Sequence, residues 1–184
     1  MTDDQGRTLL RIAREALRAT LGNRTESQAI PTTGDFDEQP RGVFVTLRHG
    51  RRLRGCIGTF QPRRSLPETV WDMAVAAAAD PRFVGNPVTL EELPDLRIEV
   101  SVLSPLRRAS DPLALRIGID GIYIAAPTGS GCFLPEVAVE CGWTPEQFLS
   151  ACCEEKAGLP ADAWRDPATE VYMFTVEHFA EPAS

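Results

Sequence analysis

The sequence predicts an α+β fold in which a mostly antiparallel sheet is flanked by helices. Three observations favour it: short β-type segments joined by hairpin signals, one strand with strict alternation, and helices that do not alternate regularly with strands. The 184 residues are 43% hydrophobic and 24% charged, a globular composition in a chain long enough to bury a sizeable core. We therefore expect one domain over residues 1–184, without solenoid repeats.

The first elements follow from periodicity and capping residues. Apolar residues at helical spacing predict an amphipathic helix over residues 5–21, which Asp3 or Asp4 caps. Residues 23–40 are polar, contain Pro and Gly and lack periodicity, which predicts a long loop. Two short β-type segments within residues 43–58 then predict a hairpin.

A second helix begins where Ser65 and Glu68 have the spacing of a capping box, and it ends at Asp80-Pro81. Its alanine-rich face permits a close approach to a sheet. The clearest strand is Leu96–Leu103, where apolar and polar residues alternate. One face of that strand is expected in the core, and the other is wet or lines a cleft.

The last third of the chain predicts another hairpin, two short helices and a final strand. Asp120-Gly121 between Arg116–Ile119 and Ile122–Ala125 is a strong hairpin signal, and a glycine-rich turn at Gly129 and Gly131 follows. The remaining expected elements are a short helix ending at Gly142, another beginning at Thr144 with Gln147 as its capping-box partner, and a strand over Glu170–Val176.

Composition also limits the possible partners and compartment. The net charge of −7 argues against long nucleic acid as a partner. An acidic N-terminus and the lack of a long apolar segment predict a cytoplasmic protein without a membrane association. Five cysteines without framework spacing indicate reduced thiols. Two histidines and the absence of CxxC or HxxxH spacing argue against a metal site, and no cofactor is expected.

Charge is unevenly distributed along the chain. Residues 41–64 contain no acid, so this segment carries +7 and leaves −14 for the rest of the −7 total. A solvated face in an arginine-biased composition is the simpler explanation, but the contrast favours an anion site for a carboxylate or phosphate. The seven arginines are Arg41, Arg48, Arg51, Arg52, Arg54, Arg63 and Arg64.

The buried face of the hairpin sets its expected register. Pairing His49 with Leu53 puts Val43, Val45, Leu47, Leu53 and Ile57 on one coherent apolar face. The opposite face then carries Arg48 beside Arg54, Thr46 beside Cys56, and Gly58 near Phe44.

Cys56 is therefore expected on an open face among guanidinium groups, which favour a reactive thiolate. The alternative is an inert small residue that lets another backbone pass closely. The flanking Gly55 and Gly58 fit either a ligand that approaches the backbone or a β-bulge. A dyad of Cys56 with His49 is disfavoured because His49 falls on the other face.

The sequence LRGCIG at 53–58, followed by Thr59-Phe60, resembles the signature hexapeptide of the AMME chromosomal-region gene product family, also called AmmeMemoRadiSam system protein A. The resemblance covers the chain from about Leu9 to Phe179, although CCEE at 152–155 departs from the expected join and leaves a helix boundary open. Other matching segments are GVFVT at 42–46, DPRF at 80–83, PVT at 87–89 before Glu92-Leu93, EVSVLS at 99–104, LPEVA at 134–138 and GWT at 142–144.

This resemblance implies a larger and a smaller lobe that share a cleft lined by the hexapeptide. It also implies partners, a Memo-like protein and a radical-SAM protein. The basic loop at Arg51 and Arg52 looks variable in the family, which favours Arg54 over both as a site residue.

Two functions remain open at this point. The first is an enzyme, or an enzyme-system subunit, whose cleft holds an anionic small molecule. Its expected residues are Cys56 as catalytic nucleophile or thiol contact, Arg54 as clamp, and Arg48, Thr46, Gly55, Gly58 and Arg82 as substrate contacts, with Asp80 as a companion or simply a helix stop. The second is a non-catalytic adaptor that docks a Memo-like or radical-SAM partner through the arginine hairpin.

Overall fold

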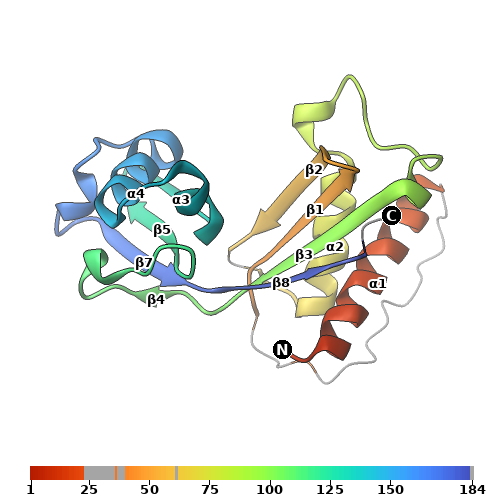
Figure 1. Ribbon diagram of the computed structural model, residues 1–184, viewed down its shortest axis with the longest axis horizontal. Helices are drawn as coiled ribbons and strands as arrows, with labels where there is room; N and C mark the ends of the chain where they lie inside the picture. Colours follow the sequence, from red (N-terminus) through yellow and green to blue (C-terminus); the bar gives the residue numbers. More distant parts are fainter. Residues whose placement is uncertain (23–35, 37–39, 61, 183–184) are drawn as a thin grey trace. The chain divides into compact units, whose positions relative to one another are not determined.

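The computed structural model describes residues 1–22, 36, 40–60 and 62–182 (Figure 1). Most of the loop predicted at 23–40 lies outside these residues. The chain divides into two units. Unit 1 comprises Met1–Leu103 and Glu177–Ser184, and unit 2 comprises Ser104–Val176. The cleft expected between two lobes remains a prediction.

Unit 1 contains a four-stranded sheet in the order β2-β1-β3-β8, with β1 antiparallel to both β2 and β3. The α+β class and the antiparallel sheet are therefore confirmed. Its strands are β1 (Val43–His49), β2 (Arg52–Thr59), β3 (Leu96–Leu103) and β8 (Val176–Ala180).

Helix α1 (Asp3–Leu21) begins two residues earlier than expected, because Thr2 is its cap. Thr2 Oγ1 accepts the Gln5 N–H, and Gln5 Oε1 accepts the Thr2 N–H. The prediction that Asp3 or Asp4 caps the helix was wrong. Both lie in the first turn, where a carboxylate interacts favourably with the helix dipole.

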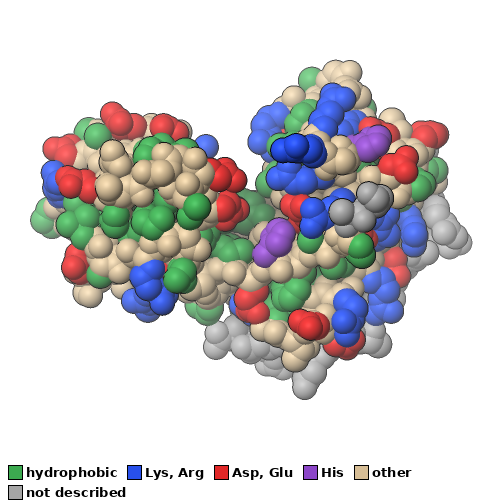
Figure 2. Space-filling model, in the orientation of Figure 1, with side chains coloured by type: hydrophobic (Ala, Val, Ile, Leu, Met, Phe, Trp, Pro, Cys, Tyr) green, Lys and Arg blue, Asp and Glu red, His purple; other side chains and the backbone are tan. Residues whose placement is uncertain are grey.

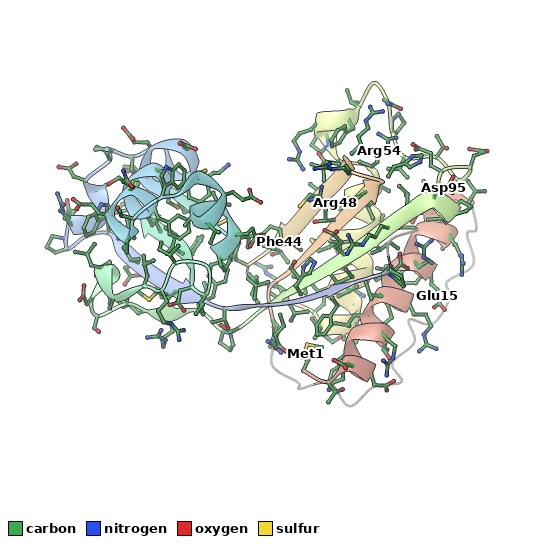
Figure 3. The ribbon with its side chains drawn as sticks, viewed as in Figure 1. Met1, Glu15, Phe44, Arg48, Arg54 and Asp95 are labelled. Atoms are coloured by element: carbon green, nitrogen blue, oxygen red, sulfur yellow. The ribbon has the colours of Figure 1, made fainter. Side chains whose placement is uncertain are left out.

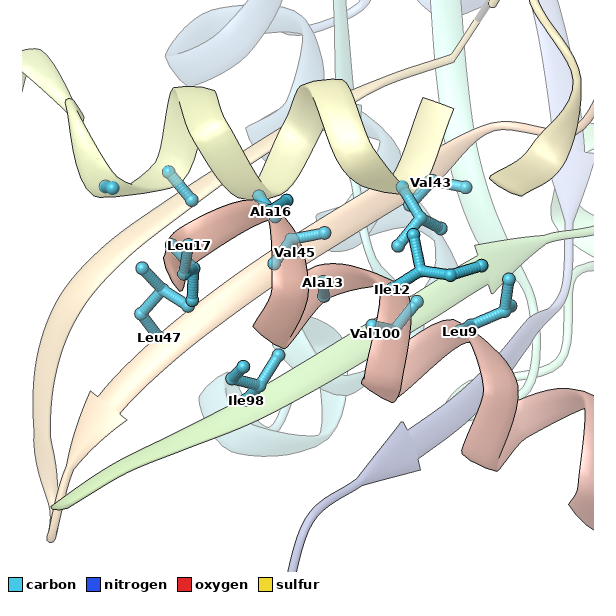
Figure 4. Packing of buried hydrophobic residues seen from close by; sticks show 14 of the residues in the cluster. Leu9, Ile12, Ala13, Ala16, Leu17, Val43, Val45, Leu47, Ile98 and Val100 are labelled. Carbon is cyan, nitrogen blue, oxygen red and sulfur yellow. The ribbon is translucent and has the colours of Figure 1, made fainter. Parts of the chain in front are cut away.

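Helix α2 (Leu66–Ala78) begins and ends as predicted. The Glu68 carboxylate accepts from both the N–H and the hydroxyl of Ser65. Figure 4 shows α1 and α2 packed over one face of the sheet, with the inward side chains of β1 and β3 pointing toward them. The fully buried part of this core includes Leu9, Ile12, Leu17, Val43, Val45, Leu47, Ile98 and Val100.

Unit 2 has its own sheet, in the order β4-β7-β5-β6, and its own core around Ile122, Ile124, Phe148 and Met173. The strands are β4 (Arg107–Arg108), β5 (Gly121–Ala126), β6 (Gly129–Phe133) and β7 (Glu170–Phe174). The helices are α3 (Pro135–Cys141), α4 (Pro145–Ala151) and a π-helix (Cys152–Ala157). Short 3-10 turns lie at Pro81–Phe83, Leu93–Asp95, Pro112–Ala114 and Ala163–Arg165.

The hairpin predicted around Asp120-Gly121 was wrong. Asp120 accepts the N–H of Arg116 and two guanidinium bonds from the same residue, so residues 116–120 close into a turn. Gly118 supplies the positive φ of +77° that this turn requires. The actual hairpin joins β5 to β6.

The glycine-rich turn was also wrong, since Gly129 and Gly131 lie within β6. A Cβ on Gly129 would lie 2.1 Å from the Ala157 carbonyl oxygen, and one on Gly131 would lie 2.5 Å from the Lys156 carbonyl carbon. These glycines therefore let the π-helix pack directly on β6. The helix boundary left open at 152–155 falls inside this π-helix, which follows α4 without a break.

Both short helices have the predicted boundaries. Gly142, at φ +65°, ends α3, and Thr144 with Gln147 begins α4. The strand expected over Glu170–Val176 is divided, because β7 ends at Phe174 and β8 begins at Val176 in the other sheet. No helix among the described residues is long and apolar enough to cross a membrane.

Candidate functional site

One face of the unit 1 sheet lies opposite α1 and α2, and we call it the helix-free face. Alternation along β1 assigns residues to it, since Val43, Val45 and Leu47 are fully buried toward the helices. Its members are Phe44, Thr46, Arg48, Cys56, Gly58, Glu99, Ser101 and His178. It includes four of the residues predicted from the sequence as site residues, namely Thr46, Arg48, Cys56 and Gly58.

The predicted register holds over most of the hairpin. Thr46 pairs with Cys56 and Phe44 pairs with Gly58. Near the turn the register shifts, so that Arg48 pairs with Leu53 and Arg54 becomes an extra residue. The predicted pairing of His49 with Leu53, and the placement of Arg48 beside Arg54, were therefore wrong.

The shift turns Arg54 into the protein interior, where it is 1% exposed. Nε and Nη2 donate to the Glu92 carboxylate at 3.0 and 2.8 Å. Nη1 and Nη2 also donate to the carbonyls of Asn86 and Pro87. Arg54, labelled in Figure 3 beside Arg48, therefore fixes the loop before β3 and offers no exposed guanidinium for an anion.

Other arginines of the 41–64 segment also have acidic partners from outside it. Arg48 pairs with Glu99, Arg41 with Glu177, and Arg64 with Glu68 and Asp72. The acid-free segment is therefore not an acid-free surface. Figure 2 shows blue side chains at the hairpin end of unit 1, where Arg51 and Arg52 are exposed.

The backbone of Cys56 is held at both polar groups. Its N–H donates to Asp80 Oδ2 at 2.9 Å, and its carbonyl accepts from Arg82 Nη2 at 2.9 Å. Arg82 also bonds the Asp80 carboxylate through Nε and Nη2. Because β2 is at the edge of its sheet, this ion pair satisfies backbone groups that no neighbouring strand reaches.

The sulfur has a partner as well, since Thr46 Oγ1 donates to Cys56 Sγ at 3.2 Å. Asp80 additionally caps the short turn after α2 by accepting the Arg82 N–H. The interpretation of Asp80 as a helix stop is therefore confirmed, and its role as a companion of Cys56 in a binding site stays a prediction.

Asp80 is buried, and the Arg82 guanidinium holds the pKa of its carboxyl well below the ordinary value of 3.8. The N–H groups of Cys56 and Arg82 lower this pKa further, against the effect of burial. The same ion pair raises the pKa of Arg82. Asp80 is therefore a carboxylate across the physiological pH range.

Asp80→Asn is expected to weaken the pH dependence of stability in acid. A carboxyl with a lower pKa in the folded than in the unfolded chain contributes stability above pH of about 4, and that contribution is lost as the pH falls toward the folded value. The amide keeps an acceptor for the Cys56 N–H but not the charge. Urea unfolding between pH 7 and pH 3 measures the effect, and parallel profiles for the two proteins would contradict it.

The two glycines beside Cys56 serve packing within unit 1. A Cβ on Gly55 would lie 2.0 Å from the Ala77 carbonyl oxygen of α2. A Cβ on Gly58 would lie 2.3 Å from the Phe44 ring. Gly55 is buried under the helix, so its predicted contact with a substrate is not available in this fold.

Some residues of the face were missed from the sequence. Glu99 lies between Arg48 and Arg97, and Ser101 Oγ lies 3.1 Å from His178 Nδ1. The alternation of residues 96–103 signalled a wet face, but nothing in the sequence placed β8 beside it. The part of the chain that the structure describes brings no three His, Cys, Asp or Glu side chains together as a metal site.

Three thiols of unit 2 are buried or half-buried. Burial raises the pKa of Cys132 to about 11, and it also raises the pKa values of Cys152 and Cys153. Cys141 is exposed at the end of α3. It is therefore the natural comparison for the reactivity of Cys56.

Comparison with known proteins bears on the whole chain. The AMMECR1 family model matches residues 10–179. A protein of Methanothermobacter thermautotrophicus is 42% identical over 98% of this chain and 96% of its own, and Protein TK0174 of Thermococcus kodakarensis is 42% identical over 97% and 91%. The crystal structure of uncharacterised protein PH0010 from Pyrococcus horikoshii is similar, with a TM-score of 0.86 and 40% identity over 98% of this chain and 93% of that one. The resemblance seen in the sequence is confirmed, and this chain belongs to the AMMECR1 family.

Proposed function

We propose that this chain is an enzyme, or a subunit of an enzyme system, that binds an anionic small molecule on the helix-free face and contacts it through the thiol of Cys56. The arrangement around Cys56 carries the proposal. Two ion-paired side chains fix its backbone, and a hydroxyl fixes its sulfur. Catalytic groups are held in this way because a small displacement costs much of the rate.

The cation of the site differs from the one expected from the sequence. Arg54 is buried against Glu92, whereas the Arg82 side chain is 56% exposed beside Cys56. Its Nε and Nη2 face Asp80 and the Cys56 carbonyl, while Nη1 has no hydrogen-bond partner among the described residues and could donate to a ligand. Arg48, on the helix-free face, is also partly exposed. Arg82 and Arg48 therefore replace Arg54 as the proposed anion contacts.

Iodoacetamide is expected to alkylate Cys56 at least about tenfold faster than Cys141, a difference of about 1.4 kcal/mol in activation free energy. The attacking Cys56 thiolate has the Arg82 guanidinium nearby and accepts a hydrogen bond from the Thr46 hydroxyl, and both interactions favour it. Exposure alone would favour the opposite order, because Cys141 is the more exposed thiol. Mass spectrometry of labelled peptides measures both rates.

Matched variants at Thr46 separate the hydrogen bond from packing. Thr46→Val keeps the shape and removes the donor, so it is expected to slow labelling at Cys56 but not at Cys141. Thr46→Ser retains the hydroxyl and is expected to label like the wild type. Labelling of Cys56 that is no faster than that of Cys141 removes the thiol from the proposed reaction.

Binding is tested by capturing small molecules from a metabolite extract with the purified chain. We expect retention of an anionic molecule that is lost in Cys56→Ser and kept in Cys141→Ser. If Cys56→Ser and Cys141→Ser retain the molecule equally well, the molecule does not bind at Cys56 and the proposed site is wrong.

The adaptor function rests on a different observation, the exposure of Arg51 and Arg52 at the hairpin turn. Docking through these charges to a Memo-like or radical-SAM partner weakens steeply with salt. If such a partner is retained at high salt and by Arg51→Glu with Arg52→Glu, docking through these charges is excluded.

A further inference from the structure

The helix-free face carries a second pair of chemically active side chains besides Cys56 and Thr46. Ser101 Oγ on β3 and His178 Nδ1 on β8 lie 3.1 Å apart. Ser101 is only 8% exposed, whereas His178 is exposed. The imidazole is therefore anchored at one nitrogen and open to solvent at the rest of the ring.

Anchoring of one ring nitrogen determines what the other can do. When Ser101 Oγ accepts from Nδ1–H, Nε2 is the unprotonated nitrogen, and its lone pair can take a proton from a bound molecule. Histidine is the side chain most often used for proton transfer in catalysis. The pair thus has the parts of a general base and the group that orients it.

The register relates this pair to Cys56. Thr46 stands between Cys56 and Glu99, and Phe44 stands between Gly58 and Ser101. Strands are about 4.8 Å apart, so the three spacings from β2 to β8, with a shift of two residues along the strands, put Cys56 and His178 roughly 15 Å apart. They cannot form a direct dyad, but one elongated molecule can touch both.

We propose that His178 is a second catalytic group of the site at Cys56, that Ser101 is the positioning residue that selects its tautomer, and that the ligand is an elongated anion lying across Thr46 and Phe44. This inference rests on the proposed function, which supplies the thiol end of the site. At the far end of the ligand, His178 Nε2 takes a proton from a water molecule as the water oxygen bonds to an ester carbon of the ligand. The C–O bond to the alcohol group then breaks, and Nε2 gives the proton to the departing oxygen.

The tautomer is measured directly, without a substrate. Nitrogen-15 NMR of the full chain reports both nitrogens of its two histidines, which His49→Gln and His178→Gln assign. We expect His178 with the proton on Nδ1. Ser101→Ala is expected to abolish this preference and Ser101→Thr to restore it, with His49 unchanged. A proton on Nε2 in the wild-type chain overturns the role of Ser101.

Reach across the face is tested with probes tethered at Cys56 in a Cys141→Ser chain. Each probe is an iodoacetamide that carries a 4-nitrophenyl ester on a linker of roughly 5 to 20 Å, a range set by the strand spacing. The Cys56 thiolate displaces iodide and forms the C–S bond. Water then attacks the ester carbon while His178 Nε2 takes its proton, and the C–O bond breaks to release nitrophenolate.

Release of nitrophenolate is expected to be fastest with a linker of roughly 15 Å and about 100-fold slower in His178→Gln. His49→Gln is the matched control and is expected to keep the wild-type rate. Probes that fail to label Cys56 contradict the proposed function and this inference with it. Labelling without a preferred length, or without loss in His178→Gln, overturns the inference alone.

Discussion

Arg54→Ala is expected to destabilise the fold by about 3–5 kcal/mol, as removal of one partner from a buried ion pair does. The substitution leaves the Glu92 carboxylate without its bidentate partner and the carbonyls of Asn86 and Pro87 without donors. Those groups lie in the loop before β3, so this loop should loosen before the sheet unfolds. Urea unfolding of the full chain measures the loss.

Two variants control for charge and geometry. Arg52→Ala removes an exposed arginine of the same strand and is expected to change stability by less than about 0.5 kcal/mol. Arg54→Lys keeps the charge but loses the two-pronged contact, so an intermediate loss is expected. If Arg54→Ala is as stable as Arg52→Ala but no longer retains an anionic ligand, then Arg54 is the anion clamp that the sequence indicated and not the structural anchor described above.

The position of Arg54 was predicted wrongly because the alternation of apolar residues does not reveal a β-bulge close to the hairpin turn. Alternation of apolar residues fixed the pairing of Thr46 with Cys56, because a slip of one residue exposes the whole apolar face. One inserted residue near the turn escapes this constraint, since only two pairs, Arg48 with Leu53 and His49 with Arg52, lie beyond it. The partner that makes the insertion favourable, Glu92, is 38 residues away in the chain.

Local chemistry made the helices predictable. Ser65 with Glu68 and Thr144 with Gln147 begin helices through hydrogen bonds within four residues, and Gly142 ends one through its own backbone conformation. The hairpin predicted at Asp120-Gly121 was wrong because the local sequence there is compatible with two different turns. The same aspartate that favours a hairpin turn can close a different turn when an arginine precedes it by four residues.

The site was partly predictable for the same reasons. Cys56 and Thr46 follow from the register, and Asp80 with Arg82 follow from a helix end that adjoins the hairpin. His178 could not be placed, because β8 joins the sheet next to β3 after unit 2 has intervened in the chain. No residue spacing in the sequence indicates that the chain comes back to the unit 1 sheet to form β8 beside β3.

Gly55→Ala is expected to destabilise unit 1 by about 3 kcal/mol, at the upper end of the cost of overpacking. The added methyl group would lie 2.0 Å from the Ala77 carbonyl oxygen, and because that oxygen belongs to the backbone, no side-chain rotation relieves the contact. Helix α2 must move away from β2. Since α2 leads directly to Asp80, the movement should also loosen the hydrogen bond that holds Cys56.

Gly50→Ala separates this clash from the general cost of replacing a glycine. Gly50 has a positive φ of 56° and open space around its Cα, so only backbone strain of about 1 kcal/mol is expected. Urea unfolding compares the two variants, and iodoacetamide labelling of Cys56 should change in Gly55→Ala alone. A Gly55→Ala chain as stable as Gly50→Ala would mean that α2 does not rest on this glycine, and the clamp on Cys56 would then be independent of helix packing.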